Sequence, residues 1–119
     1  MKVLVTGAAG QLGTELVDVF SRAGHEVVGT THQTLDICDT AAVTALFDAE
    51  RPDWILHCAA WTAVDACEAD PDRAEAVNGG GTRNLVAAAE RFGARVLYVS
   101  TDYVFDGSKT GPYLESDVP

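Results

Sequence analysis

Basic residues are scarce in this chain of 119 residues, which has 8 lysines and arginines against 18 aspartates and glutamates. The resulting net charge of −10 argues against nucleic acid and an anionic membrane surface as partners, because both attract a positively charged face. It does not exclude a nucleotide cofactor, since backbone amides can hold phosphate groups without a basic side chain. We therefore expect neither a nucleic acid nor a membrane partner.

Cysteine is also scarce, and the chain has only Cys38, Cys58 and Cys67. An odd number in a chain that is not rich in cysteine predicts free thiols in a reducing, cytoplasmic compartment. His57, Cys58 and Cys67 match no common zinc spacing, and neighbouring residues of a strand point to opposite faces. We therefore predict two buried strand residues at 57–58 and no metal site.

Long apolar runs are absent as well. The first apolar run extends only from Val3 to Val5, which is too short for a secretory signal peptide. No segment reaches the roughly 20 apolar residues that a membrane-spanning helix needs. The length and an apolar fraction of 47% suit one globular domain.

What the chain does contain is a regular alternation of strand and helix patterns. Short apolar and β-branched runs predict strands at residues 2–6, 26–30, 53–60 and 95–100. Apolar residues at helical spacing predict helices at residues 11–23, 40–50 and 71–92, the second capped by Thr40. This alternation predicts an α/β fold, a Rossmann-like doubly wound parallel sheet truncated after its fourth strand. We expect the strand order 3-2-1-4, with the first two helices on one face and the third on the other.

Three consecutive glycines, Gly79, Gly80 and Gly81, fall inside the third predicted helix. Each of them destabilises a helix interior by about 1 kcal/mol relative to alanine. Two explanations stay open at this point: the helix is kinked there, or another segment packs close to its backbone.

A glycine-rich loop, "GAAGQLG" at residues 7–13, joins the first predicted strand to the first predicted helix. Its glycines allow a tight turn, close approach of a pyrophosphate to the backbone, and close packing of the helix. The N-terminus of that helix presents free amides to an anion. No Walker lysine follows, which excludes a P-loop, and the pattern predicts a dinucleotide-binding site.

The choice between NAD and NADP is poorly marked. The second predicted strand ends with Gly29, Thr30, Thr31 and His32, without the acid that would bind a ribose 2′-hydroxyl. Arg22 and His32 are the nearest partners for a 2′-phosphate. NADH and NADPH both remain open as the cofactor.

Four segments read together, "TGAAGQLG", "LDICD", "RPDWILHCAAWTAVDACE" and "STDYVFDG", closely resemble the dTDP-4-dehydrorhamnose reductases. These enzymes belong to the extended short-chain dehydrogenase/reductase superfamily. They transfer hydride from NADH or NADPH to the 4-keto group of dTDP-6-deoxy-L-lyxo-4-hexulose in dTDP-L-rhamnose biosynthesis. The resemblance covers essentially the whole chain but only the N-terminal portion of the family. It implies that residues 1–119 form an incomplete NAD(P)-binding domain and that the sugar-nucleotide domain is absent.

The resemblance also implies roles for individual residues. The pyrophosphate would lie on the glycine loop, the adenine against "LDICD", and the nicotinamide ribose at the end of the third strand. By position, the implied cofactor-binding residues are Gly7, Gly10, Gln11, Leu12, Gly13, Asp36, Ile37, Ala59, Ala60 and Thr62. The implied substrate-binding residues are Val64, Thr101 and Asp102, and Thr101 is also catalytic because it would hydrogen-bond the keto oxygen. Asn78 would tie the third helix to the neighbouring strand.

The family's catalytic tyrosine and lysine, which share a helix face as Tyr-x-x-x-Lys, have no counterpart here. None of the three tyrosines is followed by lysine at the fourth position. We therefore expect the cofactor-binding half of a nucleotide-sugar reductase, inactive alone, whose dTDP-sugar substrate is bound by the full-length form. The alternative is a non-catalytic, regulatory nucleotide-binding module of the same superfamily. Because the fourth strand would be an open apolar edge, we also expect self-association through it.

Overall fold

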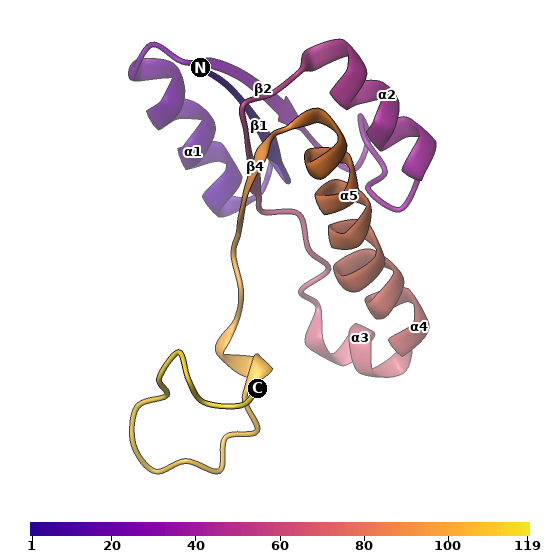
Figure 1. Cartoon of the computed structure of the whole chain (residues 1–119). Helices are drawn as coiled ribbons and strands as arrows, with labels where there is room; N and C mark the ends of the chain where they lie inside the picture. Colours follow the sequence, from indigo (N-terminus) through magenta and orange to yellow (C-terminus); the bar gives the residue numbers. More distant parts are fainter.

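The computed structural model describes residues 1–119 and contains one four-stranded parallel sheet with helices on both faces (Figure 1). Its strands are β1 (Lys2–Thr6), β2 (Glu26–Thr30), β3 (Trp54–His57) and β4 (Arg95–Tyr98). Its helices are α1 (Gln11–Arg22), α2 (Thr40–Glu50), α3 (Val64–Ala69), α4 (Pro71–Ala74) and α5 (Thr82–Phe92). A π-helical segment, η1 (Glu75–Gly81), joins α4 to α5, and η2 (Asp102–Val104) is a 3-10 turn. The predicted Rossmann-like α/β class is confirmed.

The strand order is β2-β1-β3-β4, so the predicted order 3-2-1-4 is wrong. After β2 the chain crosses over β1 and adds β3 on its other side, where Val3 pairs with Trp54. The physical reason lies in the composition of the strands. Strand β3 is buried on both faces and needs a neighbour on each side, whereas β2 carries the exposed Glu26 and Gly29 of an edge strand.

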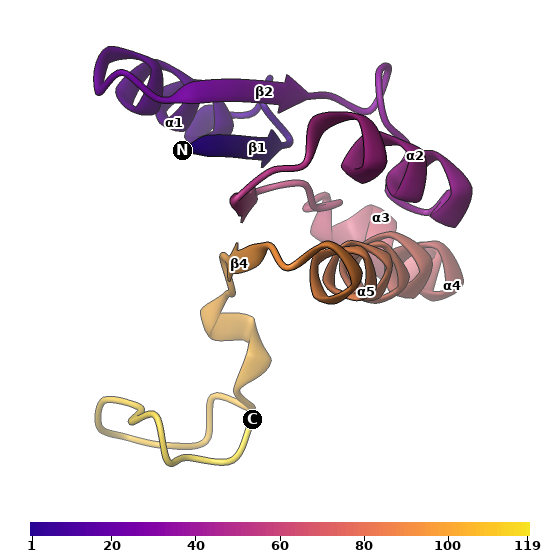
Figure 2. The ribbon, with the colours of Figure 1, turned by 45° about the horizontal axis from the view of Figure 1, so that its top comes forward.

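This change of side also decides which face each helix covers (Figure 2). Helix α1 packs alone on one face, where Leu16, Val17 and Phe20 lie against a cluster of Val3, Val5 and Leu56. Helices α2 and α5 share the other face, where the larger core cluster lies. The connection from β2 to β3 runs across the sheet in the direction opposite to the connection from β1 to β2, so a right-handed crossover places α2 on the face opposite α1. The prediction that the first two helices lie on one face was therefore wrong.

The predicted helix over residues 71–92 forms one continuous helical stretch in three pieces, α4, η1 and α5. The backbone is helical at both junctions, Ala74 and Thr82, and the glycine run lies in the π-helical piece. Close packing accounts for Gly81, because a Cβ there would lie 2.5 Å from Cδ1 of Ile37. The glycine run therefore changes the helix type and admits a neighbouring side chain without interrupting the helix.

Two helix starts are fixed by aspartates. Asp39, not the predicted Thr40, caps α2, and its carboxylate accepts from the amides of Ala41 and Ala42. Asp70 caps α4 in the same way by accepting from the amide of Arg73 at 3.1 Å. None of the helices is both long enough and apolar enough to cross a membrane.

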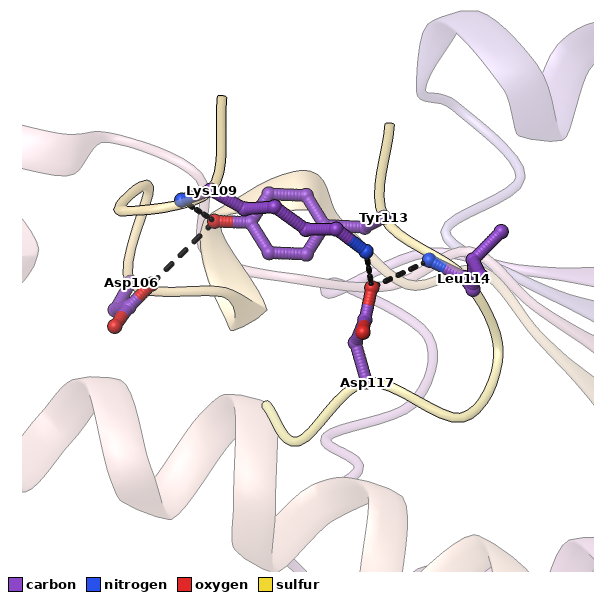
Figure 3. Close-up of polar contacts among 5 residues, drawn as sticks. All are labelled: Asp106, Lys109, Tyr113, Leu114 and Asp117. Carbon is purple, nitrogen blue, oxygen red and sulfur yellow. Dashed lines mark hydrogen bonds and ion pairs between the residues drawn. The ribbon is translucent and has the colours of Figure 1, made fainter. Parts of the chain in front are cut away.

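After β4 the chain leaves the sheet and ends in a loop that projects away from it (Figure 1). Polar contacts within the segment close this loop (Figure 3). Asp117 accepts from the Leu114 amide at 2.7 Å and pairs with Lys109, and Asp106 accepts from the Ser108 amide at 2.9 Å. The loop is therefore held by its own residues.

Candidate functional site

A cleft of about 420 Å³ lies at the carboxyl ends of β1, β2 and β3. Its walls come from the loop after β1, the segments after β2 and β3, and the α4–η1 region. The lining residues are Thr6, Gly7, Ala9, Gly10, Thr30, Thr31, His32, Gln33, Leu35, Asp36, Ile37, Cys58, Ala59, Ala60, Trp61, Arg73 and Val77. Both the size and the position are those of ligand sites in open parallel sheets.

The glycine loop forms the side of the cleft next to β1. Gly7 has φ 69°, and a Cβ on it would lie 2.8 Å from the Ala59 backbone nitrogen, so only glycine fits. The amide of Gly10 donates to the Gly7 carbonyl at 2.9 Å, which closes the turn. Gly13 follows in the first turn of α1, where a Cβ would lie 2.1 Å from the same carbonyl. The loop and the helix are thus packed backbone against backbone.

Helix α1 begins at this loop, and no side chain caps the amides of its first turn. Its cap residue, Gly10, has no side chain to accept from the first amides, and the first turn contains no acidic residue. The Thr14 hydroxyl contacts the carbonyl oxygens of Gly10 at 2.9 Å and Ala8 at 3.2 Å, which holds the loop in place. Unpaired amides at the positive end of a helix dipole attract an anion, so this corner of the cleft suits a phosphate group.

The segment after β2 forms the opposite wall. Asp36 and Ile37 line the cleft there, and the Asp36 carboxylate accepts from the Cys38 amide at 2.9 Å. Asn84 of α5 holds the same segment by donating to the carbonyls of Ile37 at 3.0 Å and Cys38 at 3.2 Å. The wall therefore presents a carboxylate and an apolar side chain on a backbone that α5 anchors.

The segment after β3 forms the third wall, with Ala59, Ala60 and Trp61. Asn78 of η1 holds the backbone of Trp61 at two points: its Oδ1 accepts from the Trp61 amide at 2.8 Å, and its Nδ2 donates to the Trp61 carbonyl at 3.0 Å. Asn78 was expected to tie its helix to the neighbouring strand, and it instead ties η1 to the segment that follows β3. The Arg73 guanidinium lies 4.5 Å from the centre of the Trp61 ring, so a cation–π contact brings a positive charge to the cleft.

His57, the last residue of β3, lies beneath this wall and is 1% exposed. Its Nδ1 lies 2.7 Å from Thr6 Oγ1, its Nε2 lies 3.0 Å from Thr82 Oγ1, and its ring stacks on Tyr98. Burial lowers the pKa of His57 to about 4, so the ring is neutral at physiological pH. Burial also raises the pKa of the neighbouring Cys58 thiol, which lines the cleft.

The structure brings together six of the residues expected from the sequence to bind cofactor: Gly7, Gly10, Asp36, Ile37, Ala59 and Ala60. Gln11, Leu12 and Gly13 form the first turn of α1, directly after the loop, while Thr62 follows Trp61 and Val64 is the first residue of α3. These five residues are not part of the lining.

Thr101 and Asp102 lie after β4 and are exposed, outside the cleft. The Thr101 hydroxyl oxygen accepts from the Tyr103 amide at 3.2 Å and lies 3.3 Å from an Asp102 carboxylate oxygen. These two residues form the N-terminal turn of η2, with no contact to the cleft lining among their hydrogen bonds.

Several lining residues were not expected from the sequence. Thr31 and Gln33 directly follow β2, and their position at a strand end is a signal that could have found them. Arg73 and Val77 gave no local signal, because their place depends on how the helix after β3 folds back over the sheet. Arg22, one of the two candidates for a 2′-phosphate, pairs with Asp18 at 2.9 Å at the far end of α1, roughly 17 Å from the loop. His32, the other candidate, lines the cleft.

Comparisons with known proteins agree on one group. The family model described as the RmlD substrate binding domain matches residues 1–119. A dTDP-4-dehydrorhamnose reductase of Streptomyces griseus is 49% identical over 112 residues, which cover 94% of this chain and 37% of that protein. A dTDP-4-keto-6-deoxy-D-glucose reductase of Streptomyces niveus is 47% identical over 97% of this chain and 40% of its own length. The chain thus spans about 40% of the length of these relatives.

Two solved structures are similar to the whole chain. The dTDP-4-dehydrorhamnose reductase of Clostridium acetobutylicum superposes with a TM-score of 0.95 at 45% identity, over 98% of this chain and 42% of that one. The dTDP-4-dehydrorhamnose reductase of Bacillus anthracis, solved in complex with NADP, gives a TM-score of 0.95 at 37% identity, over 99% of this chain and 42% of that one.

Proposed function

From the premise that the chain belongs to the RmlD substrate binding domain family, we propose that it is the cofactor-binding part of an NAD(P)H-dependent nucleotide-sugar reductase. The observation that carries this proposal is the cleft, where a glycine loop and an uncapped helix N-terminus face an acidic and an apolar residue. The relatives named above support a dTDP-sugar as the substrate. The reaction that we propose for the complete enzyme is reduction of the 4-keto group of dTDP-6-deoxy-L-lyxo-4-hexulose.

The parts of the cleft suit the parts of a dinucleotide. The unpaired amides of Gln11, Leu12 and Gly13 would hold the pyrophosphate without a basic side chain, which fits a chain of net charge −10. The Asp36 carboxylate would accept from the exocyclic amine of the adenine, with Ile37 as its apolar contact. Ala59 and Ala60 are small enough for the nicotinamide ribose to lie against the backbone.

For the choice of cofactor we propose that NADPH is accepted. No acidic side chain lies among the first residues after β2, Thr31 to Gln33, where one would bind the 2′-hydroxyl of NADH and repel a 2′-phosphate. His32 would face that phosphate in the cleft. The NADP complex of the Bacillus anthracis relative supports the same choice.

On the substrate side, the dinucleotide supplies the hydride and the protein supplies contacts. We propose that the Thr101 hydroxyl donates to the keto oxygen and that Asp102, Val64 and Thr62 border the sugar nucleotide. No tyrosine in residues 1–119 has lysine at the fourth following position, so we propose that the chain alone does not reduce a keto sugar. The second candidate function is a nucleotide-binding module without catalysis, which the same cleft would serve.

Calorimetric titration of the chain with NADPH, NADH and ADP-ribose tests the proposal. We expect all three to bind, with Gly7→Ala weakening each at least about tenfold, because a side chain there collides with the backbone of Ala59. Gly111→Ala is the matched control, since a Cβ at Gly111 has no atom within 4 Å. No binding of any of the three at millimolar concentration by a chain with a folded circular dichroism spectrum would refute a dinucleotide site.

A second measurement separates the two candidate functions. A mixture of the chain, NADPH and the 4-keto sugar should keep its NADPH absorbance, and turnover abolished by Thr101→Val would contradict that. A longer polypeptide that carries this chain and a Tyr-x-x-x-Lys pair should turn over, and a nucleotide-binding module should not. In such a reductase, Thr101→Val should lower turnover by about tenfold to a thousandfold, the range for one lost polar contact to a developing oxyanion.

A further inference from the structure

His57 has a defined hydrogen-bond direction, which its neighbours fix. The Thr82 hydroxyl donates to the carbonyl oxygen of Asn78 at 2.6 Å. A hydroxyl has a single proton to donate, so Thr82 Oγ1 must act as acceptor towards the ring nitrogen 3.0 Å away. His57 therefore carries its proton on Nε2.

The other ring nitrogen continues the same chain of hydrogen bonds. In the neutral Nε2–H ring, Nδ1 is an acceptor, so it takes the hydroxyl proton of Thr6 at 2.7 Å. The Thr6 oxygen in turn accepts from the Ala59 amide at 3.4 Å. One directed relay thus runs from Ala59 through Thr6, His57 and Thr82 to Asn78.

One end of this relay lies in the cleft wall formed by Ala59, Ala60 and Trp61, and the other end lies at the residue that holds this wall. The relay starts at the amide of Ala59, and it ends at Asn78, whose side chain holds both the amide and the carbonyl of Trp61. Thr6 belongs to β1, His57 to β3, and Asn78 and Thr82 to the helix above them. The wall is therefore linked to one buried ring on two sides, through Thr6 at Ala59 and through Thr82 and Asn78 at Trp61.

We propose that His57 is a positioning residue for the cleft and that its Nε2–H tautomer fixes residues 59–61 against β1 and η1. The partners of the ring are the hydroxyls of Thr6 and Thr82 and the ring of Tyr98, and no carboxylate, lysine or arginine is among them. Burial is the cause that keeps the ring neutral, so the relay holds its direction through the physiological range.

Nitrogen-15 NMR of the imidazole ring tests the tautomer on the unchanged chain. We expect a single Nε2–H species at neutral pH, with no titration until the pH falls below about 5, against an ordinary histidine pKa of about 6.5. A ring protonated on Nδ1, or one that titrates near its ordinary pKa, would overturn the proposal without any variant having to fold.

Thr82→Val and Thr82→Ser test the positioning role, since Thr82 itself does not line the cleft. Valine removes the link to Asn78, and we expect faster hydrogen exchange at the amides of Ala59 and Trp61 together with a mixture of ring tautomers. Serine keeps the hydroxyl and should restore both. Unchanged exchange at Ala59 and Trp61 in the valine variant would show that the relay does not hold the wall.

The expected effect on ligand affinity rests on the proposed function. Thr82→Val should weaken ADP-ribose binding by about threefold to tenfold, the effect of losing one hydrogen bond, and Thr82→Ser should not. If the unchanged chain fails to bind ADP-ribose, the proposed function fails, while the tautomer and exchange measurements still decide the relay. If it binds, and valine alters exchange but leaves affinity unchanged, the positioning role for the ligand is refuted.

Discussion

Gly13→Ala sets helix propensity against loop packing, and the two predict opposite results. Gly13 is the third residue of α1 and its one buried residue. Alanine is favoured over glycine in a helix interior by up to about 1 kcal/mol, so propensity alone predicts a more stable chain. A Cβ at Gly13, however, would lie 2.1 Å from the Gly7 carbonyl oxygen and 2.8 Å from the Ala8 Cα.

The geometry decides which effect is larger. Ordinary contact to a Cβ begins at 3.4 Å, so the oxygen and the new carbon must separate by about 1.3 Å. Gly7 cannot easily retreat, because its own backbone already lies against residues 58–59. Overpacking of this kind costs about 1–3 kcal/mol, and we place Gly13 at the upper end because both clashing atoms are backbone. Subtracting the gain in propensity leaves a net destabilisation of about 2 kcal/mol.

The same shift would move the amides that we propose for the pyrophosphate. Affinity for ADP-ribose should therefore fall at least about tenfold, which corresponds to about 1.4 kcal/mol. Urea denaturation followed by circular dichroism measures the first effect, and calorimetric titration measures the second. Gly80→Ala is the helical control: its nearest neighbour would be the Glu75 carbonyl oxygen at 3.8 Å, so stability should stay the same or rise and affinity should not change. A Gly13→Ala chain as stable as the control, with unchanged affinity, would refute the packing of the loop.

Three other outcomes are expected. The pKa of His57 is about 4 in the folded chain and about 6.5 in the unfolded chain, so the unfolded chain binds the proton more tightly. The free energy of unfolding should therefore fall by about 2.5 kcal/mol when the pH is lowered from 7.5 to 4.5. Urea denaturation at both pH values should show this loss in the unsubstituted chain and not in His57→Gln. An equal loss of unfolding free energy in the two chains would exclude His57 as the cause. Asn84→Leu should weaken ADP-ribose binding by about threefold to tenfold in calorimetry, because it removes the hydrogen bonds that hold the cleft wall at Ile37. Arg83→Ala, at the exposed neighbouring position, is the control, and equal affinities of the two variants would contradict the role of Asn84. Leu97→Lys on the exposed edge strand β4 should shift the chain towards monomer in light scattering. If the unsubstituted chain is already a monomer, self-association through that edge is disproved.

The sequence predicts the elements of this fold well and their arrangement less well. Strand β1 is identifiable because a strand buried on both faces is a short apolar run, and α1 because its apolar residues recur at helical spacing. Neither pattern says on which side of β1 the third strand will pair. That information was present in another form. The exposed Glu26 and Gly29 mark β2 as an edge strand, whereas Ile55, Leu56 and His57 of β3 are all buried, as in an interior strand. Composition compared between strands, not periodicity within one, would have given the observed order.

In the candidate site, too, residues in local turns can be predicted from the sequence, and residues placed by long-range packing cannot. Gly7 and Gly10 are found from sequence because a turn with positive φ and a helix start are local events. Arg73 reaches the cleft only because the helix after β3 returns over the sheet, which no local pattern encodes. The π-helical piece around Gly81 was equally hidden, since its relation to Ile37 joins segments more than forty residues apart.

The two halves of the proposed reaction are built by different kinds of contact. The cleft depends on long-range hydrogen bonds within this chain, such as those from Thr6 to His57 and from Asn84 to Ile37. By contrast, every hydrogen bond made by residues 101–119 stays inside that segment, as Figure 3 shows for Lys109 and Asp117. The orientation of Thr101 is therefore set by its own turn and not by the sheet. It follows that substitutions after β4 should leave nucleotide binding unchanged, so that cofactor affinity and substrate contact can be altered independently.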